Sequence, residues 1–202
     1  MNNLSKLLKN KTPIWFMRQA GRYLPEYKRI RKKEKNFLNL CFNPDLAAEI
    51  SLQPINRFNF DFVILFCDIL VIPYALGKEV DFKEKLGPII EKTRNVSEFK
   101  NLNYDTSMER LSPVMETIKK IKEQRPEKNL IGFCGGPLTT FLFMFRGNEH
   151  QKSFKNAIKY FYKNRTESIK IIEQITEASI EYVENQVKNG IQCFQLFETY
   201  CG

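Results

Sequence analysis

The chain has 202 residues, of which 43% are hydrophobic, and its formal net charge is +9. It is long enough to bury one sizeable core, and no apolar run is long enough for a membrane span. Residues 1–12 lack the apolar block of a signal peptide, and the five cysteines and single histidine show neither C-x-x-C spacing nor a zinc ligand set. We therefore expect a cytoplasmic globular protein with no disulfide framework and no metal site.

The positive charge raises the question of nucleic-acid binding. The one dense basic run, residues 28–33, lacks interleaved aromatic residues for base stacking and contains no recognised DNA- or RNA-binding motif. An electrostatic funnel toward an anionic substrate explains this run at least as well.

Apolar runs and breakers predict alternating strands and helices along the chain. The predicted strands cover residues 13–17, 62–66, 130–134 and 191–197. The predicted helices cover residues 44–57, 107–124, 137–146, 151–163 and 166–188. The helix at 44 has the clearest start, because Asn43 suits the N-cap and Pro44 the first helical position. Residues 78–105 are polar and irregular, with turn residues at Gly87-Pro88 that favour a hairpin.

Buried strands separated by helices indicate parallel βα units. The chemically unusual residues come just after the strands, as in a (β/α)8 TIM barrel, whose active sites lie at the carboxyl ends of its strands. Such a barrel typically needs about 250 residues. The sequence therefore predicts one α/β domain over residues 1–202, a truncated barrel with only the first four βα units, incomplete at its C-terminus.

Arg18 and Arg22 stand four residues apart in a segment where a helix is unfavourable. Gly21 loosens the backbone there, and Pro25 disfavours the α conformation in the residue before it. Two guanidiniums on one loop suit a substrate with several carboxylates, since each offers planar, bidentate hydrogen bonds. The alternative is a pair of solvated surface arginines.

Four stretches carry a resemblance to one family. They read PIWFMRQAGRYLPEY at 13–27, FDFVILFCDILVIPYALG at 60–77, IGFCGGPLT at 131–139 and LFET at 196–199. In these stretches the chain resembles the N-terminal part of uroporphyrinogen decarboxylases, which remove four acetate carboxyls from an octacarboxylate tetrapyrrole in heme and porphyrin biosynthesis.

The resemblance implies roles for individual residues. Asp68 aligns with the aspartate that accepts hydrogen bonds from the pyrrole N–H groups and stabilises the transition state, and Arg18 takes part in catalysis. The substrate-binding positions are Arg18, Gln19, Ala20, Gly21, Arg22, Asp68, Phe143 and Thr199.

Thr199 keeps the hydroxyl of its family position. Phe143 stands where the family has a tyrosine, and Leu138 where it has a tryptophan. Without the resemblance, Asp68 also reads as a helix N-cap before Ile69.

The resemblance also implies a lyase that converts uroporphyrinogen III to coproporphyrinogen III without a cofactor, because the protonated pyrrole itself acts as the electron sink. It implies a tetrapyrrole substrate, no nucleic acid, no membrane, and a homodimer only for a complete barrel.

Two alternatives stay open at this point. One is a corrinoid-linked methyltransferase of the same superfamily, in which His and Cys ligands for zinc come from the half of the barrel absent here. The other is a degraded, non-catalytic remnant or a basic binding module, which Phe143, Leu138 and the early stop favour. Salt-sensitive RNA binding without tetrapyrrole binding would support that second alternative.

Overall fold

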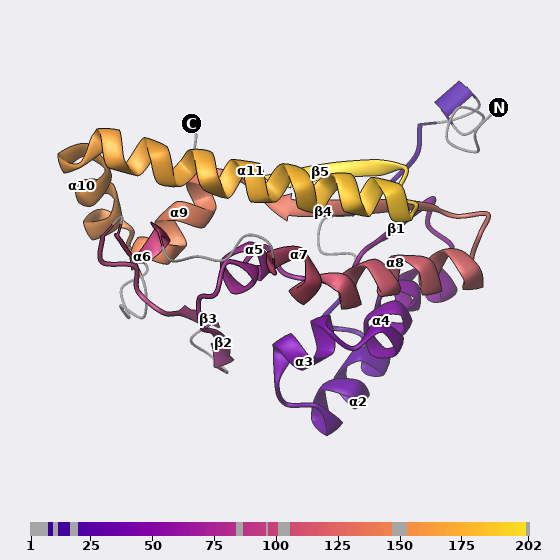
Figure 1. Ribbon diagram of the computed structural model, residues 1–202. Helices are drawn as coiled ribbons and strands as arrows, with labels where there is room; N and C mark the ends of the chain where they lie inside the picture. The colour runs from indigo at the N-terminus through magenta and orange to yellow at the C-terminus, as the bar shows by residue number, and fades with distance from the viewer. Residues whose placement is uncertain are drawn as a thin grey trace. The chain divides into compact units, whose positions relative to one another are not determined.

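The computed structural model describes residues 8–9, 12–16, 20–83, 87–95, 97–100, 106–146 and 153–200 (Figure 1). The strands are β1 Phe62–Ile64, β2 Val80–Lys83, β3 Gly87–Ile90, β4 Asn129–Gly135 and β5 Cys193–Phe197. The helices are α2 Pro25–Lys33, α3 Phe37–Cys41, α4 Pro44–Phe58, α5 Val71–Ala75, α6 Ser97–Lys100, α7 Ser107–Arg110, α8 Ser112–Gln124, α9 Pro137–Arg146, α10 Lys155–Lys163 and α11 Arg165–Asn189.

A sheet with the order β1-β4-β5 confirms the predicted α/β class. β1 and β4 pair in parallel, with Phe62 opposite Asn129. Along β4 and β5 the paired residue numbers rise together, since Gln192 N–H donates to the Leu130 carbonyl and Gly136 N–H to the Phe197 carbonyl. This order of bonds is that of a parallel pair. The strands of this sheet are joined by helical segments, as parallel strands require.

The chain divides into two compact units. The first unit comprises Met1–Cys67, Ser112–Phe133 and Val183–Gln195, and the second comprises Asp68–Leu111, Cys134–Tyr182 and Leu196–Gly202. Each unit is described by itself below.

In the first unit, α4 packs against α8 and β1. The predicted start of α4 is confirmed: the Asn43 side chain accepts a hydrogen bond from Leu46 N–H at 3.1 Å, and Pro44 takes the first helical position. Buried Gln186 of α11 bonds both the N–H and the carbonyl of Phe133 at 3.1 Å, so it holds the end of α11 on β4. Gly190, at φ 115°, then reverses the chain into β5.

In the second unit, β2 and β3 form the hairpin that the turn residues at 87–88 favoured, with Val80 opposite Ile90. The N–H of Thr93, just after the hairpin, donates to the carbonyl of Met144 at 2.9 Å and so ties this segment to α9. Helix α9 has the predicted bounds and packs on α10.

The predicted buried strand over residues 13–17 is wrong over the part that the structure describes. Residues 12–16 are irregular, and Ile14 and Phe16 are more than half exposed. Pro13 has no N–H to donate, and the N–H of Ile14 bonds the Asp61 carboxylate at 2.9 Å instead of a neighbouring strand. Met17 lies outside the described residues.

Smaller differences concern helix boundaries. The helix predicted over 107–124 is interrupted at Leu111 and forms α7 and α8. Residues 153 and 154 precede α10 instead of belonging to it, and 151–152 fall outside the described residues. Helices α2 and α3 form over residues 25–41, where the apolar pattern predicted no element.

Candidate functional site

The arginine loop of the first unit keeps Arg22 at the surface. Residues 20–24 form a turn, closed by Leu24 N–H bonding the Gly21 carbonyl at 3.1 Å, and α2 begins at Pro25. The exposed Arg22 guanidinium lies over the Phe37 ring, 5.0 Å from its centroid. This contact orients the cation while leaving it in water, where a carboxylate can reach it. Arg18 and Gln19 lie outside the described residues.

Buried aromatic side chains pack against Phe37, the ring beneath the Arg22 guanidinium. Phe37 meets Phe66 edge-on at 5.5 Å, and buried Tyr27 lies 6.0 Å from Phe66. The N–H of Phe66 donates to buried Ser51 Oγ at 2.8 Å, and the Ser51 hydroxyl donates to the Ala47 carbonyl at 2.7 Å. The chain just after β1 is therefore fixed to α4.

The basic run 28–33 lies on α2 and does not form a purely positive surface. Arg29, Lys32 and Lys33 line a cleft of about 1080 Å³ whose lining also includes Glu26, Glu34, Asp45 and Glu49. Arg57 pairs with Glu26 at 2.5 Å, and this hydrogen bond holds the pKa of Glu26 below its usual range.

Asp68 opens the second unit and shapes the turn before α5. Its carboxylate accepts a hydrogen bond from Leu70 N–H at 3.0 Å, and its carbonyl lies 3.5 Å from Val71 N. The N-cap of α5 is Leu70, without a side-chain bond, so Asp68 is not the N-cap residue. The side chain stays partly exposed, which leaves it within reach of a ligand.

Glu198 joins the end of β5 to the start of α9. Its carboxylate accepts hydrogen bonds from the N–H groups of Leu138 and Thr139 at 3.1 Å, and from the Thr139 hydroxyl. A negative group at a helix N-terminus is favourable, because free N–H groups point outward there. A Cβ at Gly136 would lie 2.6 Å from Glu198 Cβ, so this approach requires glycine.

Thr199 is positioned through the same network. Its N–H donates to Thr139 Oγ1 at 3.0 Å, and the residue is exposed. Glu198 and Thr139 were not predicted as site residues. A carboxylate directly after a strand was the available signal, but its partner 59 residues away in sequence is set only by the fold.

Phe143 and Arg146 lie one turn apart on α9. The Phe143 ring meets the Phe154 ring edge-on at 5.2 Å, and the Arg146 guanidinium carbon lies 4.7 Å from both ring centroids. Burial lowers the pKa of Arg146, and the nearby Tyr200 raises it by a smaller amount. Arg146 was not among the predicted site residues.

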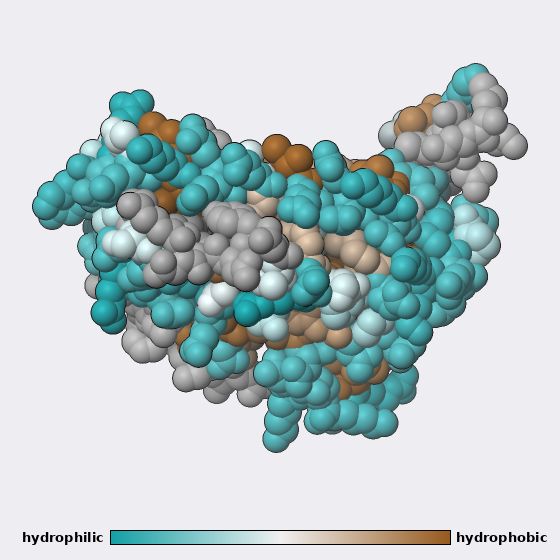
Figure 2. All heavy atoms as spheres, in the orientation of Figure 1, coloured by the Kyte–Doolittle hydropathy of each residue, from teal (hydrophilic) through white to brown (hydrophobic). Residues whose placement is uncertain are grey.

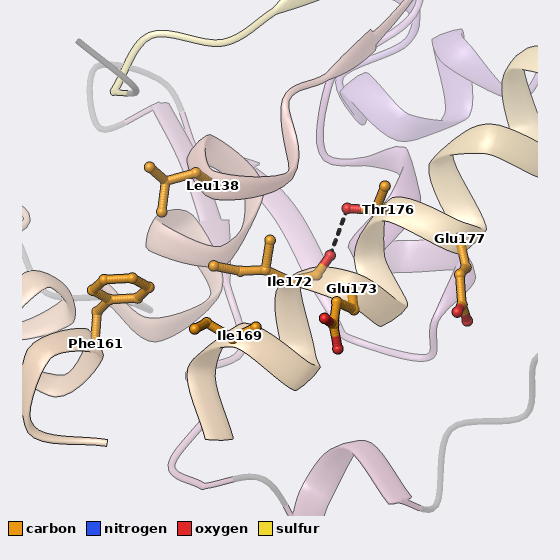
Figure 3. A pocket seen from close by; sticks show the side chains of 7 residues that line it. All are labelled: Leu138, Phe161, Ile169, Ile172, Glu173, Thr176 and Glu177. Carbon is orange, nitrogen blue, oxygen red and sulfur yellow. Dashed lines mark hydrogen bonds between the residues drawn. The ribbon is translucent and has the colours of Figure 1, made fainter. Parts of the chain in front are cut away.

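Leu138, which stands where the resemblance implies a tryptophan, lines an apolar groove of about 470 Å³. Figure 3 shows Leu138, Phe161 and Ile172 gathered around it, while Glu173 and Glu177 follow along α11. Apolar atoms also emerge among the charged ones along α11 in Figure 2, and Ile169 and Ile180 of this helix are 40% and 55% exposed.

Among the described residues, no group of three or more His, Cys, Asp or Glu side chains is arranged to hold a metal ion. Within the same part of the chain, no helix is both long enough and apolar enough to span a membrane.

Comparison with known proteins supplies the family. The sequence profile of "Uroporphyrinogen decarboxylase (URO-D)" matches residues 5–202. The uroporphyrinogen decarboxylase of Rickettsia felis is 46% identical over 194 residues, which cover 96% of this chain and 56% of that protein. The one from Rickettsia bellii is 44% identical over 198 residues, covering 98% of this chain and 58% of the relative. The chain thus spans little more than half the length of the relatives it matches.

A solved structure, a methyltransferase from Methanosarcina mazei, superposes with a TM-score of 0.63 at 20% identity. The match covers 84% of this chain and 50% of that protein, and it supports a similarity of fold alone.

Proposed function

The chain belongs to the uroporphyrinogen decarboxylase family, and from this premise we propose that it takes part in converting uroporphyrinogen III to coproporphyrinogen III. The reaction would be that of a carboxy-lyase in porphyrin and heme biosynthesis. The family match over residues 5–202 carries the proposal, because it includes the arginine loop, Asp68 and Thr199.

The finer fold belongs to the same proposal. The parallel strands β1, β4 and β5 would be consecutive strands of a (β/α)8 barrel, within one domain. A complete barrel of this kind would form a homodimer and work in the cytoplasm, without nucleic acid as a partner.

The chemistry follows from the substrate. Each acetate arm, –CH2COO⁻, becomes a methyl group as CO2 leaves and one proton is gained. Protonating the pyrrole on carbon creates a cation that takes up the electron pair of the breaking C–C bond, and proton transfer then completes the methyl group and restores the pyrrole. An anion beside the ring stabilises that cation. Asp68, after β1, would serve as this anion and bind the pyrrole N–H groups.

The remaining residues would bind the periphery of the substrate. Arg18 and Arg22 would pair with its carboxylates, with Arg18 also stabilising charge during catalysis. The backbone of Gln19, Ala20 and Gly21 would shape the pocket. Thr199 would offer its hydroxyl, and Phe143 would present an apolar ring at the position where the resemblance implies a tyrosine.

The test is a decarboxylation assay that follows coproporphyrinogen III. The 202-residue chain would be assayed alone and together with the C-terminal part of the Rickettsia felis relative that this chain does not match. Asp68→Asn replaces an acceptor oxygen by a donor facing the pyrrole N–H groups, and should reduce turnover about 100- to 1,000-fold.

Asp81→Asn is the matched control, because Asp81 is exposed on the β2–β3 hairpin of the same unit. It should leave turnover unchanged. Product formation by Asp68→Asn at the control's rate would remove Asp68 from the mechanism. No product from the native chain in either sample would contradict the proposed function.

A further inference from the structure

Arg146 occupies a corner built from two aromatic rings. Its guanidinium carbon lies 4.7 Å from the centroids of both Phe143 and Phe154, whose planes are 78° apart. Phe154 is 8% exposed, and its other neighbour is the Tyr200 ring, with centroids 4.7 Å apart. We call Phe143, Arg146, Phe154 and Tyr200 the aromatic corner. The rings hold the cation in place and remove much of its water.

This cation has no counter-charge in the part of the chain that the structure describes. Its Nε atom is buried and makes no hydrogen bond, and no carboxylate there lies within ion-pair distance of it. Glu198 lies two residues before Tyr200 in the sequence. Its carboxylate accepts hydrogen bonds from the N–H groups of Leu138, Thr139 and Tyr200.

A buried, charged donor without a partner is costly, and native structures generally pair such groups. The lowered pKa of Arg146 has the same origin in burial. An anion that reaches the corner would pair the orphaned Nε–H, and a carboxylate fits the planar donor fork of arginine with two parallel hydrogen bonds.

We propose that Arg146, set in the aromatic corner, is a carboxylate-binding residue of this protein. As a subsite for an acetate or propionate arm of a tetrapyrrole, the inference rests on the proposed function. Its place favours that ligand, because Phe143 and Thr199 are both proposed substrate-binding positions and Tyr200 directly follows Thr199.

The first experiment detects carboxylate binding without a tetrapyrrole. In the side-chain ¹⁵N–¹H spectrum of the 202-residue protein, the Arg146 Nε–H signal is identified by its loss in Arg146→Lys. Titration with tricarballylate, a small tricarboxylate, should move this signal saturably, while the signal of exposed Arg165 stays in place. An Arg146 signal that does not respond at any concentration overturns the inference.

The second experiment measures binding of uroporphyrin, the stable oxidised form of the octacarboxylate, by fluorescence. Arg146→Gln should raise its Kd about 10- to 100-fold, as expected for loss of a charge-assisted pair. Arg146→Lys keeps the charge without the planar fork and should raise the Kd by less. Arg165→Gln removes the same charge from an exposed position on the same unit and should change the Kd less than about twofold.

The two experiments separate the inference from the proposed function. A tricarballylate response without uroporphyrin binding would contradict the tetrapyrrole function and keep the carboxylate site. Equal uroporphyrin affinity in the native protein, Arg146→Gln and Arg165→Gln would overturn the inference and leave the proposed function standing.

Discussion

Among the residues that the structure describes, two arginines rest on phenylalanine rings, and these two differ in solvation. Arg22 is exposed and lies over a single ring, that of Phe37, at 5.0 Å. Arg146 is half-buried between two rings at 4.7 Å, with its Nε sealed from water. The same type of contact therefore leaves one cation hydrated and the other short of a partner. Burial, more than the stacking itself, decides how strongly each should respond to an anion.

Two double-mutant cycles, one for each arginine, test most directly whether the two contacts differ in energy. A cation over an aromatic ring is worth about 0.5–1 kcal/mol when exposed and about 2 kcal/mol when desolvated. The cycle of Arg146→Met with Phe154→Leu should therefore give a coupling near 2 kcal/mol in the free energy of unfolding, measured by urea denaturation. The cycle of Arg22→Met with Phe37→Leu should give roughly 0.5 kcal/mol.

Both cycles replace an arginine and a buried ring by the same residues, so each serves as the other's control. Equal couplings would mean that the aromatic corner is as hydrated as the arginine loop, and would remove the distinction between them.

The salt dependence of ligand binding distinguishes the two arginines further, and Arg22→Gln tests it. An exposed pair is worth less than a desolvated one, so this variant should weaken uroporphyrin binding about fivefold, or about 1 kcal/mol, at low salt. The difference should vanish near 1 M salt, where the Debye length falls to about 3 Å. The loss caused by Arg146→Gln should persist to a larger extent there, because a half-buried pair is screened by salt less than an exposed one. Fluorescence titrations at two salt concentrations measure both effects.

Lys119→Gln is the control for this salt experiment, since Lys119 is exposed on α8 of the same unit and lies outside the basic run. It should leave the Kd unchanged at high salt and nearly unchanged at low salt. A loss at Arg22 that persists in 1 M salt would show that the loop closes over its ligand.

The elements that the sequence predicted well are those with local signals. Asn43 and Pro44 mark the start of α4, and Pro137 marks the start of α9, because capping and proline geometry depend only on neighbouring residues. The segment at 13–16 misled for the opposite reason. Its apolar side chains resemble a buried strand, but whether they are buried depends on a partner that the sequence does not reveal.

Helices α2 and α3 were missed although they carry start signals. Pro25 stands at the first turn of α2, and the Asn36 side chain accepts from Leu38 and Asn39 N–H groups at the start of α3. Helix α2 is highly charged and buries only Tyr27 and Ile30, and α3 has only five residues. Neither segment therefore carries enough apolar residues to be predicted from a hydrophobic pattern.

The candidate site divides in the same way. The placement of Asp68 and Thr199 just after strands β1 and β5 followed from the strand pattern, and the structure has them there. Arg146 could not be found that way, because the sequence around it does not indicate that its guanidinium lies over the Phe154 ring, or that Tyr200 packs on that ring. The proposed role of Arg146 depends on the tertiary packing that leaves its Nε atom buried without a hydrogen-bond partner.

Phe143→Tyr gives the smallest expected effect and refines the aromatic corner. A tyrosine ring keeps the contact with Arg146 and adds the hydroxyl that the resemblance implies for this position. One added hydrogen bond to the ligand is worth about 0.5–1 kcal/mol, so the Kd for uroporphyrin should fall roughly two- to fivefold. The free energy of unfolding should stay within about 0.5 kcal/mol of the native value, because Phe143 is only partly buried.

Phe58→Tyr, on exposed Phe58 of α4, is the matched control and should change neither quantity. Weaker uroporphyrin binding in Phe143→Tyr alone would mean that the corner is packed for phenylalanine, with the carboxylate of the ligand lying where the new hydroxyl would stand.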